Sequence, residues 1–110
     1  MRIERELMRG AGPVAVMQLL EDGEKYGYEL VKRLEKQSKG VLAMGQSTLY
    51  PMLYNLEAKG LVASRIETAE NGRPRKYYRL TGKGKRQLIK DRRQWEAMSA
   101  AMGQLGVIGG

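Results

Sequence analysis

The sequence predicts a mainly α-helical protein with a small β-hairpin and a long last helix. Apolar residues recur at helical spacing in residues 13–58, and again after residue 81. Between these regions, residues 61–81 alternate between polar and apolar side chains around the turn-forming pair Asn71-Gly72. The chain has 110 residues, which suits one domain, and no linker or internal repeat divides it.

The first helix is expected in the stretch GPVAVMQLLEDG, residues 12–23. Pro13 suits its first turn, and Gly23 suits the position just past its end. Residues 1–10 would add either a leading helix or an arm. A second helix is expected from Gly27 to Gln37. Its apolar stripe would be formed by Tyr28, Leu30, Val31 and Leu34.

Residues 46–58 form the third predicted helix, and Gly60 is placed to end it. The apolar residues that would hold it to the core are Leu49, Leu53 and Leu56. Pro51 lies near the helix start, where a missing N–H costs least. If the helix begins at residue 46, however, this proline should bend or tighten the first turn. Tyr50 and Tyr54 fall off the apolar stripe, so we expect them to face outward.

Two short strands follow, in LVASRIET at 61–68 and RKYYRLT at 75–81, and Tyr78 is expected in the core. Thr81 suits the N-cap of a fourth helix. A heptad seam on that helix is formed by Leu88, Trp95, Met98, Met102 and Leu105. Asp91 interrupts this seam. The final stretch GQLGVIGG contains four glycines and is expected to fray.

Three helices, a two-stranded hairpin and a long helix, in this order, make a winged helix–turn–helix architecture. We expect residues 1–81 to form a winged helix–turn–helix DNA-binding domain. Residues 82–110 would form a C-terminal dimerisation helix and a flexible tail, in one structural unit with that domain. Because a two-stranded hairpin is marginally stable alone, it must pack on the helices.

The composition excludes several classes of function. The chain has no Cys and no His, which removes disulfides, thiolate metal sites and imidazole-based catalysis. We therefore predict no enzyme activity, no metal and no cofactor. No apolar run approaches the ~20 residues of a membrane span. The charged start MRIERELMRG is not followed by a signal-peptide pattern, so we expect a cytoplasmic protein without a membrane partner.

The positive charge is concentrated in the second half of the chain. Residues 1–60 hold nine basic and eight acidic residues, whereas residues 61–110 hold eleven basic and four acidic ones. Between Arg73 and Arg93, ten basic residues face Asp91 alone. This distribution suits a polyanionic partner, either nucleic acid or an acidic membrane surface, and a solvated basic face is the alternative.

In a helix–turn–helix protein, the second helix of the motif lies in the DNA major groove, and its N-terminal residues meet base edges. Gln can pair with adenine through two hydrogen bonds, and Ser or Thr can serve either base type. Basic residues of the hairpin would contact phosphates and so add affinity without reading sequence. The predicted contacts to double-stranded DNA are Gln46, Ser47, Thr48, Tyr50, Tyr54 and Asn55 on the third helix, and Arg73, Arg75 and Lys76 on the hairpin.

Three motifs resemble the PadR family of bacterial transcriptional regulators. They are YGYEL at 26–30, STLYPMLYNLEAKGLV at 47–62 and NGRPRKYYRLTGKGKRQL at 71–88, and the resemblance covers roughly residues 13–105. The family pattern at the start of the reading helix is similar to Gly-Thr-Leu-Tyr-Pro. Here Ser47 takes the glycine place, which puts a hydroxyl near the DNA.

The resemblance implies a homodimeric repressor, in which the C-terminal helices pair. It also implies release from the DNA when an aromatic or drug-like effector, or another stress signal, is sensed. The short chain, with one helix after the hairpin, resembles the smaller subfamily. In some multidrug-sensing members, a tryptophan matching Trp95 lines a pore at the dimer centre. Met98 and Asp91 would lie at the same effector site.

Packing remains the favoured interpretation of Trp95, because aromatic residues in a seam more often fill the interface than line a pocket. Asp91 has two interpretations: it pairs with Lys90 or Arg92 of the partner subunit, or it faces a ligand cavity. Two other functions stay open for the whole chain. One is a ligand-sensing helical module that acts through a protein partner. The other, disfavoured by the lack of His and Cys, is a small enzyme for an anionic substrate.

Overall fold

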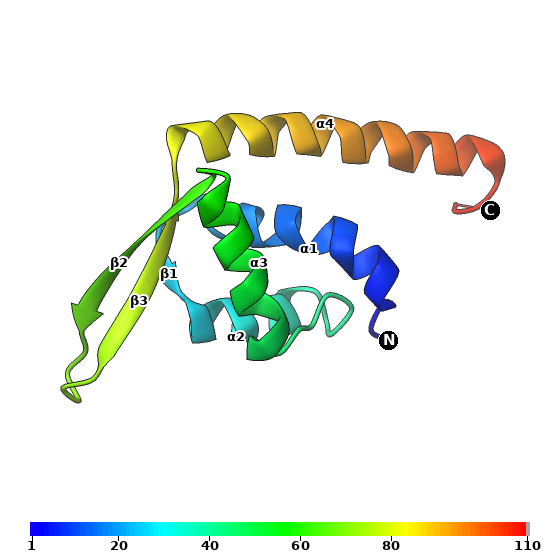
Figure 1. Cartoon of the computed structure of the whole chain (residues 1–110). Coiled ribbons are helices and arrows are strands. Elements are labelled where there is room, and N and C mark those ends of the chain that lie inside the picture. The colour runs from blue at the N-terminus through cyan, green and yellow to red at the C-terminus, as the bar shows by residue number, and fades with distance from the viewer. Residues whose placement is uncertain (110) are drawn as a thin grey trace.

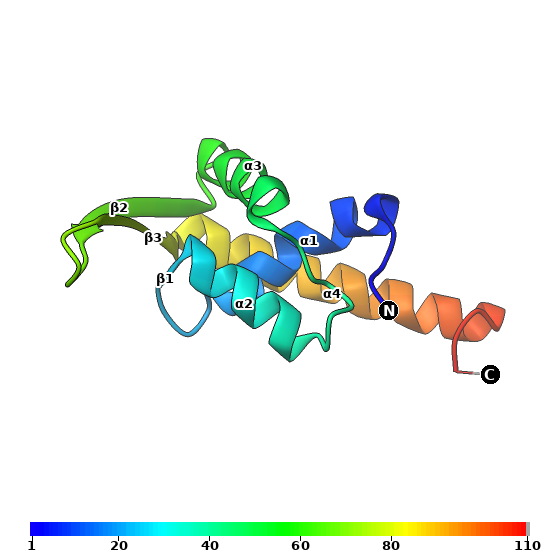
Figure 2. The same ribbon diagram turned by 90° about the horizontal axis from the view of Figure 1, so that it is seen from below.

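The computed structural model describes residues 1–109 and shows four helices and a three-stranded antiparallel sheet of order β1-β3-β2. The elements are α1 (Arg5–Leu19), β1 (Lys25–Tyr26), α2 (Gly27–Gln37), α3 (Gln46–Ala58), β2 (Val62–Thr68), β3 (Pro74–Leu80) and α4 (Gly82–Leu105). The β2–β3 hairpin extends as a wing from a unit of α1, α2 and α3, and α4 runs along the side of α1 remote from α2 (Figures 1 and 2). The predicted fold class is confirmed.

Helix α1 is longer than predicted. It begins at Arg5, so the N-terminal segment is continuous with it, and Pro13 lies inside the helix instead of in its first turn. A proline at this depth removes one helical hydrogen bond. The added turns bury Met8 and Ala11, which offsets part of that cost.

Strand β1 is absent from the sequence prediction, because two residues carry no periodicity. Lys25 pairs with Tyr78 and Tyr26 with Tyr77 of β3. Lys25 is buried, and its ammonium group bonds to the Asp22 carboxylate, which lowers the pKa of Asp22. The short strand therefore ties the connection between α1 and α2 to the wing.

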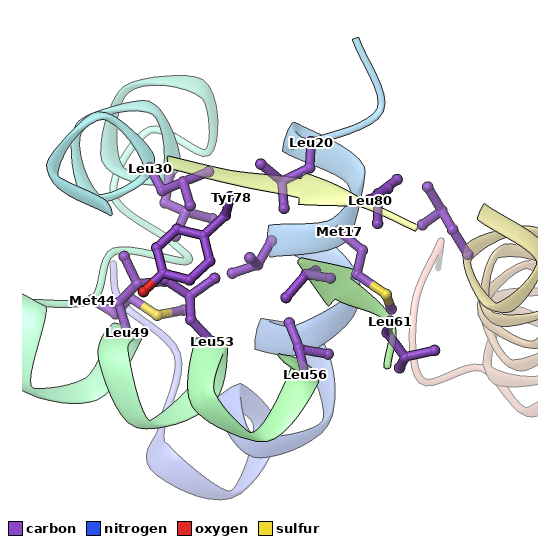
Figure 3. Packing of buried hydrophobic residues seen from close by; sticks show 14 of the residues in the cluster. Met17, Leu20, Leu30, Met44, Leu49, Leu53, Leu56, Leu61, Tyr78 and Leu80 are labelled. Carbon is purple, nitrogen blue, oxygen red and sulfur yellow. The ribbon is translucent and has the colours of Figure 1, made fainter. Parts of the chain in front are cut away.

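The core fills the space between the three helices, the base of the wing and the start of α4. Leu30 from α2, Leu49 and Leu53 from α3 and Leu88 from α4 are all buried (Figure 3 shows most of this cluster). Tyr78 points into the core as predicted, and burial raises the pKa of its phenol. The helices and the hairpin thus share one hydrophobic cluster.

Two side chains lie differently from the prediction. Tyr28 is 46% exposed, because α2 buries the line of Gly27, Leu30 and Leu34 and turns Tyr28 away from it. Leu88 is 1% exposed in the core of its own chain. Its assignment to the dimer seam is therefore wrong, since no side-chain surface remains for a partner.

The turn of the wing is formed by residues 69–73. The Gly72 N–H donates to the Ala69 carbonyl at 2.9 Å, and the Asn71 side chain accepts from the Arg73 N–H at 3.0 Å. Gly72 has a φ of 80°, whereas Asn71 is not in the left-handed region. The predicted reversal at Asn71-Gly72 is therefore present, and glycine alone supplies the positive φ.

A tight junction joins the wing to α4. The Thr81 side chain accepts from the Gly84 N–H at 2.9 Å, which confirms it as the N-cap, and its hydroxyl donates to the Gly60 carbonyl at 2.7 Å. A Cβ added to Gly84 would lie 1.9 Å from the Leu61 carbonyl oxygen. Only glycine allows α4 to start this close to the backbone just before β2.

Helix α4 continues to Leu105, so the first three residues of the stretch predicted to fray are helical. The Val107 N–H then donates to the Met102 carbonyl at 2.9 Å, and Gly106 has a φ of 86°. This is the pattern of a Schellman C-cap. The last residue of the predicted flexible tail, Gly110, lies outside the described residues.

Gly84→Ala should destabilise the fold by about 2 kcal/mol or more, because the added methyl group overlaps backbone that has no rotamer to yield. Gly103→Ala in the same helix is the matched control, since its Cβ would meet only the Ile108 carbonyl, at 4.0 Å. That variant should be neutral or stabilised by up to about 1 kcal/mol. Urea unfolding checks both, and equal midpoints for the two variants would contradict the junction.

Candidate nucleic-acid interface

The N-terminal turn of α3 faces solvent. Gln46, Ser47 and Thr48 are all exposed. The N-cap residue is Gly45, which has no side chain to accept a hydrogen bond from the first N–H groups of the helix. The positive end of the helix dipole is therefore presented at the surface. The three residues predicted to read bases lie together there.

Tyr54 and Tyr50 differ in their surroundings. Tyr54 is 72% exposed, whereas Tyr50 is 40% exposed and packs on α2. A Cβ added to Gly27 would lie 2.6 Å from the Tyr50 ring, so this glycine makes room for the ring. The tyrosine therefore supports the contact between α2 and α3 while one edge stays accessible.

Pro51 lies at the sixth position of α3, one turn deeper than a proline is normally tolerated without cost. Its missing N–H leaves the Ser47 carbonyl without its helical donor. Both residues are exposed, so water or an external donor can satisfy that carbonyl.

The three predicted cations of the wing do not form one cluster. The Arg75 guanidinium lies 4.6 Å from the centre of the Tyr26 ring, on the face of the sheet that points away from the core. Lys76 lies on the opposite face, where its ammonium is 3.8 Å from the Glu57 carboxylate. Arg73 is exposed in the turn. The wing thus presents positive charge on both faces and at its tip.

Sequence reasoning missed an aromatic and basic layer on the outer face of the sheet. The rings of Tyr26 and Tyr77 meet edge to face at 5.7 Å, and Arg65 lies 4.9 Å from the Tyr77 ring. Arg65 also pairs with Glu24, and this guanidinium lowers the pKa of the Glu24 carboxyl. Alternation along the strands predicts that Arg65, Arg75 and Tyr77 share a face of the hairpin. Tyr26 joins that face only because β1 pairs with β3, which the sequence does not indicate.

The predicted seam on α4 is exposed after Leu88. Its remaining members have exposed fractions of 38% for Trp95, 42% for Met98, 38% for Met102 and 79% for Leu105. A hollow of about 300 Å³ lies between α1 and α4, beside Trp95 and Met98. Its other lining residues are Gly10, Pro13, Val14, Asp91 and Gln94. The Asp91 carboxylate accepts from the Gln87 amide at 2.8 Å.

Two further features bear on function. Within residues 1–109, no group of three or more Asp or Glu side chains is placed to hold a metal ion. In the same part of the chain, none of the helices combines the length and the apolar character that a membrane span requires.

Comparisons with known proteins agree on one family. The sequence profile of the transcriptional regulator PadR-like family matches residues 16–90. The chain is 35% identical over 95 residues to the transcriptional regulator Rv3488 of Mycobacterium tuberculosis, covering 86% of this chain and 85% of that protein. It is also 36% identical to a PadR family transcriptional regulator from Eggerthella lenta, with a TM-score of 0.79 over 96% of this chain and 88% of the other.

A third similar structure contains nucleic acid. PadR of Bacillus subtilis, solved in complex with operator DNA, is 26% identical and has a TM-score of 0.68. The match covers 73% of this chain and 45% of that longer one.

Proposed function

Because the chain belongs to the PadR-like family of transcriptional regulators, we propose that it binds operator DNA as a homodimer and acts as a repressor. One observation carries the proposal. The exposed N-terminal turn of α3 and the tip of the basic wing lie toward the same side of the molecule, the lower side in Figure 1, while the base of the wing adjoins the other end of α3. The similar PadR of Bacillus subtilis, solved with operator DNA, supports this assignment.

In this proposal α3 enters the major groove, and Gln46, Ser47 and Thr48 meet base edges. The dipole of α3 favours an approaching phosphate. Tyr54 and Asn55, both exposed, and the accessible edge of Tyr50 lie behind the reading turn and contact the DNA backbone. Arg73, Arg75 and Lys76 add phosphate contacts from the wing.

Dimerisation follows from the apolar seam that remains uncovered in the single chain. Trp95, Met98, Met102 and Leu105 lie at intervals of three and four residues along α4, which is the spacing of one helix face. A partner α4 packed on this face would bury them. Two copies related by a two-fold axis would then bind an inverted repeat whose half-sites lie about one helical turn apart.

The hollow beside Trp95 supports an effector site within that dimer. Its volume of about 300 Å³ matches the lower end of the usual range for small-molecule pockets. Trp95 and Met98 offer apolar and polarisable walls for a planar aromatic compound, and Asp91 offers a carboxylate. An effector here would change the angle between the paired helices, and so alter the distance between the two reading helices.

Removal of wing charge should weaken binding to every sequence. We expect Arg73→Ala combined with Arg75→Ala to lower the affinity for operator and for random duplex DNA alike, and to flatten the dependence on salt, because phosphate contacts release counterions. Ser47→Gly should instead change which base is preferred, since Ser47 lies in the reading turn. Gel-shift titrations over a range of salt concentrations check this. Unchanged affinity of the double wing variant would exclude the wing as a contact.

The dimer should depend on the middle of the seam. Met98→Asp with Met102→Asp should give monomers at micromolar concentration and abolish binding to the inverted repeat, because the seam would have to bury two carboxylates from each chain. Ala97→Asp is the control, because it adds a carboxylate to the same helix without removing a seam residue. Light scattering coupled to size-exclusion chromatography gives the mass. A wild-type monomer at that concentration would contradict the seam.

The effector site has a direct optical reporter, because Trp95 is the only tryptophan in the sequence. Planar aromatic compounds that bind in the hollow should quench its fluorescence and displace the protein from operator DNA. Trp95→Leu should still bind DNA but should no longer respond to the compound. If no compound in a broad aromatic panel changes the emission, Trp95 is a packing residue of the dimer core.

A further inference from the structure

A basic groove lies between the N-terminal half of α1, the loop before α3 and one flank of α3. It has a volume of about 660 Å³. Four of its lining residues are cations, namely Arg2, Arg5, Arg9 and Lys59, and none of its lining residues is acidic. The ion pairs found within residues 1–109 all involve other basic side chains. The four cations of the groove therefore lie outside these ion pairs, and Glu4 and Glu6 are the acidic residues nearest to the three arginines in the sequence.

The segment that carries the three arginines is anchored to the body of the protein. The Ile3 N–H donates to the Val41 carbonyl at 3.1 Å, and Met8 is buried in the core. Further along, α1 crosses α3 so closely that a Cβ at Gly12 would lie 2.6 Å from the end of the Met52 side chain. Arg5 and Arg9 are thus presented from a fixed helix, and Arg2 from the segment before it that Ile3 ties to Val41.

The groove and the wing lie on opposite flanks of α3. Thr48, Asn55 and Lys59 line the groove side, whereas Glu57 on the other flank pairs with Lys76 of the wing. Figures 1 and 2 show α3 between the wing and the N-terminal end of α1. A helix with side chains is about 10–12 Å wide, and the major groove is about 12 Å wide. A helix seated there therefore turns one flank toward each phosphate strand.

Two of the three predicted cations of the wing have a partner in the fold, although only one of them is paired with an acidic group. Lys76 is paired with Glu57, and Arg75 is stacked on Tyr26, so Arg73 is the most open cation of the three predicted ones. By contrast, Arg2, Arg5 and Arg9 are all exposed. The exposed charges placed to neutralise the second strand therefore lie in the N-terminal segment, at Arg2 before α1 and at Arg5 and Arg9 within it.

We infer that this groove is a second clamp for the DNA backbone, in which Arg2, Arg5, Arg9 and Lys59 hold the phosphate strand on the side of α3 opposite the wing. The inference rests on the proposed DNA-binding function and adds the contact surface that completes it. The family match begins at residue 16, so the three arginines lie outside the matched residues. Phosphate contacts of this kind set affinity and register without reading bases.

The test compares two triple variants that remove the same number of charges. Arg2→Gln, Arg5→Gln and Arg9→Gln together remove the clamp. Arg86→Gln, Lys90→Gln and Arg93→Gln together remove three exposed cations from α4, on the helix face opposite Trp95. The probes are a genomic duplex selected by the wild-type protein and a scrambled duplex of equal length. Circular dichroism and thermal melting establish that both variants fold.

The clamp variant should bind both duplexes about tenfold or more weakly near physiological salt, and its slope of log affinity against log salt should fall by about 0.9 for each phosphate that the variant no longer neutralises. Its preference for the selected duplex should stay the same. The α4 variant should show a much smaller change. If the wild-type protein binds the selected duplex and the clamp variant matches its affinity and slope, the inference is wrong while the proposed function stands. A wild-type protein that binds neither duplex would overturn both.

Discussion

The structure depends on the close approach of α4 to Leu61, in the short connection between α3 and β2. Gly84 lies against the Leu61 carbonyl, and the Thr81 hydroxyl reaches the Gly60 carbonyl and caps α4 at the same point. The Lys83 ammonium adds a bond to the Lys59 carbonyl at 2.8 Å. The end of α3, the base of the wing and the start of α4 are therefore fixed to one another within a few residues.

This junction gives the proposed regulation a physical route. A change in how two α4 helices pack would move each DNA-reading unit as a rigid body, because no flexible linker lies between them. Two arrangements of the paired helices would then correspond to two separations of the reading helices, of which one fits the operator. The hollow beside Trp95 lies between α1 and α4, where a bound compound would bias that choice.

Helix α3 shows how one short stretch serves several roles. Leu49, Leu53 and Leu56 hold it to the core, while Ser47 and Pro51 lie on the exposed side. Tyr50 fills the space that Gly27 leaves open. Pro51 does not suit the interior of an amphipathic helix, but it lies on this exposed side, where the carbonyl that it frees can find a partner outside the fold.

The order of the helices and the hairpin, the bounds of α3 and its buried leucines could be predicted from sequence. Apolar periodicity, turn glycines and the Thr81 cap are local signals. Tertiary packing decided the rest. Pro13 indicated a helix start, but burial of Met8 extended α1 past it. The heptad pattern cannot tell a partner from the chain's own core, so it assigned Leu88 to the wrong surface. Strand β1 and the α1–α3 groove both need the fold, because they join residues distant in sequence.

The most direct test of the account is a genome-wide map of binding by the wild-type protein, followed by footprinting of the strongest region. We predict a protected inverted repeat, occupied by one dimer, with half-sites about one helical turn apart. Protection should extend over the phosphates on both sides of each reading helix. The absence of any protected region would contradict DNA binding, and would favour a ligand-sensing module that acts through a protein partner.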